Sequence, residues 1–94
     1  MTVEYTQFEE LTVGNSALGL TASKYGTLNS AKITIAGANM RFKVDGGTAT
    51  STEGHILYDS DELELESHEE IVAFSAIRDD STDVELSASY GVNR

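Results

Sequence analysis

Residues 31–58 read AKITIAGANMRFKVDGGTATSTEGHILY and carry the clearest folding information in the chain. Two runs in this stretch alternate apolar and polar residues, and their apolar members are Ala31, Ile33, Ile35, Met40, Phe42 and Val44. Because a strand points successive side chains to opposite faces, each run predicts a strand with one buried face and one wet face. Asp45-Gly46-Gly47 then supplies residues that tolerate a positive φ, which indicates a turn. The stretch predicts an antiparallel β domain.

The composition sets limits on partners. The chain has 94 residues and no cysteine, so we expect one domain over residues 1–94 that is stabilised by an apolar core without disulfides. Its 6 Lys and Arg against 16 Asp and Glu give a net charge of −10, which repels nucleic acid and anionic lipid and favours solubility. The start lacks the basic and apolar regions of a signal peptide, and no apolar run reaches the ~18 residues of a membrane span. We therefore expect no nucleic-acid partner and no membrane partner.

The N-terminal residues show no single period. Val3 and Tyr5 alternate as in a strand, whereas Phe8 and Leu11 are spaced like one helical turn. We expect residues 1–9 to form an extended arm, followed by a strand near Glu10–Val13. Apolar residues in a terminal arm usually need a neighbour to order them, so Val3, Tyr5 and Phe8 are the candidate docking residues. The alternative is that they cover the domain's own core.

Further short strands are expected at Leu18–Ala22, His55–Tyr58, Leu63–Leu65 and Val84–Tyr90, with turn signals between them. Ser67-His68-Glu69-Glu70 matches a helix capping box, but Ile71–Phe74 is rich in β-forming residues. We favour a strand leading into Arg78 and keep a helix as the alternative. Seven or eight short strands predict an all-β fold, a single antiparallel β-sandwich of jelly-roll-like type or a small barrel.

The acidic segment 53–70 is a candidate metal site that does not match a known ligand pattern. It holds eight carboxylates and no Lys or Arg. Asp59 and Asp61 begin like a calcium loop, but Leu63 takes the next alternate position and no glycine follows. His55 and His68 are too far apart in sequence to form a ligand pair such as His-x-x-x-His. We expect a solvated strand face, surface histidines, and no metal or other cofactor.

Catalytic motifs are also missing from the sequence. Residues 14–19 do not match the Gly-x-Ser-x-Gly nucleophile elbow, and Gly46-Gly47 lacks the Lys-Ser/Thr of a phosphate-binding loop. We therefore expect no enzyme. The four tyrosines, Tyr5, Tyr25, Tyr58 and Tyr90, could stack on sugar rings, although their strand spacing favours core packing.

From Met40 to Leu57 the sequence resembles small β-structured virion proteins of tailed bacteriophages. The resembling features are an alternating strand with basic residues, the Asp45-Gly46-Gly47 turn, a Thr-rich segment and a short apolar strand. Phe74-Ser75-Ala76-Ile77-Arg78 and the closing strand Val84–Tyr90 extend the resemblance, which covers about residues 30–91. The proline that we expect beside the threonine after the turn is absent from Ala49-Thr50.

The resemblance implies a structural role in the virion, namely a head decoration (cement) protein that binds the major capsid protein on the outside of the shell and stabilises it. It also implies a homo-oligomer such as a trimer, made in the host cytoplasm and found in the virion. A phage tail-associated protein and a carbohydrate- or receptor-binding module are the alternatives.

Overall fold

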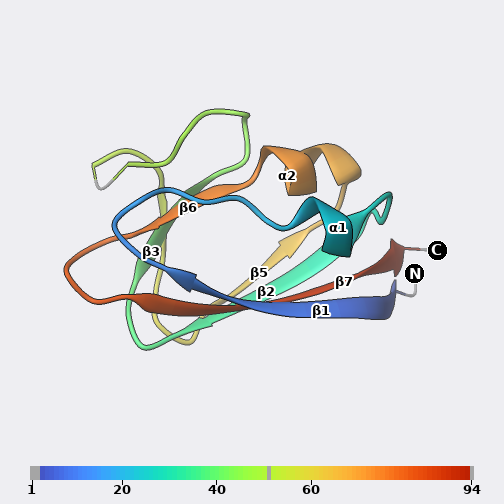
Figure 1. The fold of residues 1–94 in the computed structure, drawn as a ribbon, viewed down its shortest axis with the longest axis horizontal. Helices are drawn as coiled ribbons and strands as arrows, with labels where there is room; N and C mark the ends of the chain where they lie inside the picture. The colour runs from blue at the N-terminus through green and yellow to red at the C-terminus, as the bar shows by residue number, and fades with distance from the viewer. Residues whose placement is uncertain (1–2, 51, 94) are drawn as a thin grey trace.

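A computed structural model describes residues 3–50 and 52–93 as two antiparallel sheets packed face to face, with two short helices at one side (Figure 1). The strands are β1 (Val3–Val13), β2 (Ser30–Ala36), β3 (Met40–Lys43), β4 (His55–Leu57), β5 (Glu62–Leu65), β6 (Ser75–Arg78) and β7 (Val84–Asn93). The helices are α1 (Ala22–Tyr25) and α2 (His68–Ala73). The larger sheet has the order β1-β7-β2-β5 and the smaller has β4-β3-β6. The predicted sandwich is confirmed, and the alternative of a closed barrel is wrong.

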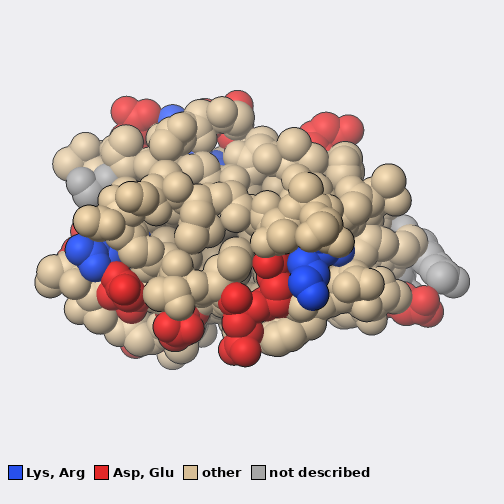
Figure 2. Space-filling model, in the orientation of Figure 1, with Lys and Arg blue, Asp and Glu red and all other residues tan. Residues whose placement is uncertain are grey.

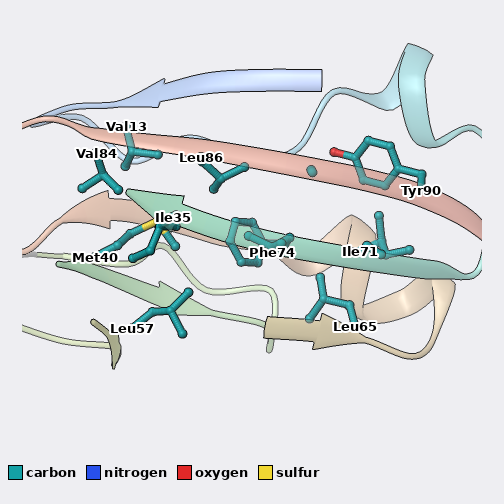
Figure 3. Packing of buried hydrophobic residues seen from close by; sticks show 14 residues of the cluster. Val13, Ile35, Met40, Leu57, Leu65, Ile71, Phe74, Val84, Leu86 and Tyr90 are labelled. Carbon is teal, nitrogen blue, oxygen red and sulfur yellow. The ribbon is translucent and has the colours of Figure 1, made fainter. Parts of the chain in front are cut away.

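The core lies between the sheets and follows the alternation read from the sequence. Ala31, Ile33 and Ile35 of β2 and Leu86 and Ala88 of β7 are buried. Figure 3 shows Tyr90 and Ile71 at one end of this core and Val13 and Val84 at the other. Phe42 and Val44 were predicted to be buried but are half-buried; they pack against the core without being enclosed by it. Phe42 instead stacks on Phe74, with ring centroids 6.0 Å apart.

The predicted strand through Ile71–Phe74 is wrong, and the capping box prevails. Ser67 Oγ accepts the backbone N–H of Glu70 at 3.2 Å, and the Glu70 carboxylate accepts the backbone N–H of Glu66 at 3.1 Å. The first bond satisfies a free N–H group in the first turn of α2, and the second ties the residue before the N-cap to the helix. Helical spacing then buries Ile71 and leaves Val72 exposed. The strand begins only at Ser75.

Two other expectations need correction. The short strand expected at Leu18–Ala22 is absent: Leu18 makes a single bridge to Ala76, and α1 begins at Ala22. The strand expected near Glu10 begins at Val3 and pairs with β7 over its whole length. Residues 3–9 are therefore part of the larger sheet and do not form a separate arm; Met1 and Thr2 lie outside the described residues.

A buried carboxylate joins β1 to the rest of the molecule. Glu9 is buried, and its Oε2 accepts a 2.5 Å hydrogen bond from the hydroxyl of Tyr90 and a 3.1 Å bond from the backbone N–H of Thr21. Thr21 is the residue that precedes α1, and Tyr25 of α1 packs edge-on against the Tyr90 ring. One side chain thus connects β1, β7 and α1.

We predict that Tyr90→Phe lowers the free energy of unfolding by about 1–3 kcal/mol, because it leaves the buried Glu9 carboxylate with one donor fewer. Burial, and then the hydrogen bond to Glu9, raise the pKa of the Tyr90 hydroxyl above its ordinary value of 10.0. The unfolded chain therefore releases this proton first, and the stability that Tyr90 contributes declines as the pH rises above about 10. Denaturant titrations from pH 7 to 11 measure both effects.

The control is Tyr58→Phe, because Tyr58 is 58% exposed. It should leave both the stability and its pH dependence close to those of the unsubstituted protein. Equal effects of the two substitutions would contradict the role assigned to Tyr90.

Candidate docking surfaces

The three candidate docking residues of β1 lie on one face of the larger sheet. The pairs Val3–Asn93, Tyr5–Gly91 and Phe8–Ser89 set them against alternate residues of β7. The two β7 residues on either side of Ser89, Ala88 and Tyr90, are buried between the sheets. Since side chains of paired residues point to the same face, Val3, Tyr5 and Phe8 all lie on the outer face. We call these three residues the outer strip.

A β-bulge makes the outer strip possible. In a regular strand, residues 3 and 5 point to one face and residue 8 to the other. Here the register shifts between Tyr5 and Gln7, so that β1 advances by two residues while β7 advances by one. The extra residue, Thr6, reverses the alternation. Tyr5 is consequently 41% exposed and Phe8 53% exposed on the same surface.

Gly91 allows the two strands to approach at the bulge. A Cβ at this position would overlap the carbonyl oxygen of Glu4 and come within 2.8 Å of the Cα of Tyr5. Real side chains do not tolerate such contacts with backbone atoms, so only glycine fits without moving β1. The bulge and Gly91 together fix the position of Tyr5.

An uncharged groove forms a second candidate surface. It has a volume of about 510 Å³ and is bordered by three segments far apart in sequence, namely residues 17–19, 46–48 and 72–75. None of these residues is charged, although the chain carries a net charge of −10. Val72 stands at its border and is 55% exposed. Figure 2 shows that on the face seen in Figure 1 charged groups lie mainly along the margins and lower edge.

Hydrogen bonds hold the groove wall at residues 46–48. The backbone N–H of Ala49 donates to Ser75 Oγ at 3.1 Å, and Lys43 pairs with Glu53 at 2.9 Å across the loop. At the predicted turn, Gly46 has φ 89°, which favours glycine, and Asp45 Oδ1 accepts the N–H of Gly47 at 2.9 Å. That hydrogen bond lowers the pKa of Asp45. The turn leads into this wall and does not connect two strands directly.

Two carboxylates of the acidic segment and both histidines make contacts within the fold. Asp59 accepts the backbone N–H of Gly37 at 3.0 Å, and Asp61 accepts that of Tyr58 at 3.0 Å, so both carboxylates stabilise the turn that ends at β5. The His55 ring packs against Phe42, and His68 Nδ1 lies 3.1 Å from the carbonyl oxygen of Leu28. Within residues 3–50 and 52–93, no three His, Asp or Glu side chains cluster in a way that could hold a metal ion. In the same part of the chain, neither helix is long and apolar enough to cross a membrane.

Comparison of the chain with protein-family models, curated proteins and solved structures finds no match. The outer strip and the groove are therefore described as candidate docking surfaces from the geometry of this structure alone. Sequence reasoning named the outer-strip residues but missed the groove, whose only sequence signal is that residues 14–23 and 46–50 carry no charge.

We predict that Gly91→Ala detaches the start of β1 while leaving the core folded. The added methyl group displaces the backbone at Glu4 and Tyr5. Among the β1 amides that donate to β7, those in residues 3–6 should therefore exchange faster, and those from Gln7 to Val13 should keep their slow exchange.

Ser89→Ala is the matched control, because Ser89 lies on the same face of β7 opposite Phe8. It should leave exchange in residues 3–6 unchanged. Slow exchange in residues 3–6 of the Gly91→Ala variant would mean that the close approach at Gly91 is not required.

Proposed function

We propose that this protein is a structural virion protein of a tailed bacteriophage, a head decoration protein that binds the outside of the capsid without catalysing a reaction. The observation that carries the proposal is the outer strip, in which Tyr5 and Phe8 are exposed and Val3 is half-buried, on a strand that pairs with β7 over its length. The sequence resemblance over residues 30–91 supplies the class of partner, the major capsid protein. The proposal places Val3, Tyr5 and Phe8 at that contact.

The surroundings of the outer strip suit contact with a large, flat partner. Tyr5 and Phe8 face Gly91 and Ser89 across the strand pair, so short residues border both aromatic rings. A partner surface can then approach the sheet closely and enclose the rings. Aromatic side chains that fill a partner's pocket contribute most of the binding energy in typical interfaces. A ligand that binds only the assembled shell stabilises that shell by mass action.

The proposal also assigns the protein to the head of the virion rather than to its tail. A tail-associated protein would present the outer strip to a tail subunit in the same manner. Exposed aromatic rings such as Tyr5 and Phe8 also suit stacking on sugars, which keeps a carbohydrate- or receptor-binding module as the second candidate. Binding to capsids and binding to glycans distinguish these candidates directly.

We predict saturable binding of the purified protein to empty phage capsids, measured by co-sedimentation, and no binding to a glycan array. The double substitution Tyr5→Ser with Phe8→Ser should weaken capsid binding about thirtyfold or more, since two anchors of roughly 1–2 kcal/mol each are lost. Because both side chains are exposed, the melting temperature should change little.

Two control variants locate the contact. Tyr58→Ser removes an equally exposed aromatic side chain outside the outer strip, and Val72→Asp places a charge at the border of the groove. Both should bind capsids like the unsubstituted protein. Loss of binding in Val72→Asp alone would move the contact to the groove, and glycan binding without capsid binding would contradict the decoration function.

A further inference from the structure

The free edge of β1 is the one long, uncovered sheet edge in the described residues. The order β1-β7-β2-β5 places β1 at one side of the larger sheet, and Figure 1 shows it along the lower side of the molecule. From Tyr5 to Val13 its backbone forms ladder pairs with β7 alone. A strand with an unpaired edge presents N–H and C=O groups that another strand can pair with.

The other three edges are protected. The outer edge of β6 is already paired, because Leu18 and Ala76 exchange backbone hydrogen bonds of 2.9 and 2.8 Å and Arg78 donates to the carbonyl of Gly14 at 3.1 Å. Strand β4 has 3 residues. Strand β5 has 4 residues, two of them glutamates, and charged short edges disfavour pairing. Strand β1 carries three glutamates and the bulge at Thr6, but at 11 residues it is the longest strand, and no described segment pairs with its outer edge from Tyr5 to Val13.

We propose that the free edge of β1 pairs, antiparallel, with β1 of a second copy of this chain around a two-fold axis at Phe8. An edge related to itself by a two-fold axis is self-complementary, and such isologous contacts are the commonest in homo-oligomers. Main-chain hydrogen bonds between strand edges would supply the contact. The inference rests on the proposed function in that it says how copies meet on the capsid.

The charges of β1 select the register. With the axis at Phe8, Glu9 faces Gln7 of the second copy, so no two carboxylates are directly opposed in the regular part of the pairing. An axis at Glu9 or at Glu10 would set that carboxylate against its own copy, and like charges directly across a strand pair are destabilising. Among registers without such a pair, the axis at Phe8 also brings two exposed aromatic side chains together.

This pairing would double the docking surface. Both copies keep the same outer face, because a two-fold axis perpendicular to a sheet preserves its faces. The outer strips of the two copies then lie side by side on one continuous sheet. The bulge at Thr6 limits regular pairing to the residues around Phe8, so we expect a weak dimer in free solution that is best detected by covalent trapping.

The test is disulfide trapping of Phe8→Cys, which is unambiguous because the chain has no cysteine. Opposed residues in an antiparallel pair have Cα atoms about 4.5–5.5 Å apart, within the range of roughly 4.4–6.8 Å that a disulfide spans. Mild oxidation of the purified variant without capsids should double its mass on a non-reducing gel, and reduction should reverse this. Thr12→Cys is the control on the same strand, because the axis at Phe8 places its two copies about 27 Å apart at roughly 3.4 Å per residue.

Efficient trapping of Phe8→Cys with little trapping of Thr12→Cys supports the pairing. Equal trapping of both, or of neither, overturns it. Since no capsid is present, the result is independent of capsid binding: a protein that dimerises through β1 without binding capsids would refute the decoration function and keep the pairing. Capsid binding by a protein whose Phe8→Cys variant is never trapped would keep the decoration function and refute the pairing.

Discussion

The hydrogen bond between the Tyr90 hydroxyl and the Glu9 carboxylate allows the inner face of β1 to hold a glutamate. Leu11 and Val13 lie on this face and pack in the core, so hydrophobicity favours it over the face that carries Phe8. Glu9, which this orientation buries, finds a donor in Tyr90 and a second one in the N–H of Thr21. Val13, on the same side of β1 as Glu9, is buried in the core and supports this orientation. Phe8 is left on the outer face as a consequence.

The bulge at Thr6 extends the apolar outer face from Phe8 toward the N-terminus. By reversing the alternation it places Val3 and Tyr5 on the same face as Phe8, and Gly91 provides the space for it. An apolar surface is therefore held on a rigid sheet by a buried polar contact and a backbone irregularity. Both features hold the outer strip on one face of the sheet, which is why we connect them with binding. The same strand also supplies the free edge, so attachment and self-association would depend on one element.

The sequence predicted the parts of this structure in which a regular period coincides with burial. Strands β2 and β7 alternate without interruption, and their buried residues were identified from Ala31 to Ile35 and from Val84 to Tyr90. Strand β1 was predicted only near Glu10–Val13, because its bulge breaks the period closer to the N-terminus: Val3 and Tyr5 occupy odd positions and Phe8 an even one. Helix α2 was kept only as the alternative to a strand, because the β propensity of Ile71–Phe74 was weighted above a capping box. The groove could not be predicted, since three distant segments meet only after folding.

The most direct test of this account is a cryo-electron microscopy map of capsids incubated with the protein, in which the docked face can be seen. The account predicts the outer face of the larger sheet against the shell, with Val3, Tyr5 and Phe8 enclosed by capsid residues and the groove beside α2 facing away. A map in which α2 and residues 46–48 contact the shell while the outer strip faces solvent would contradict it.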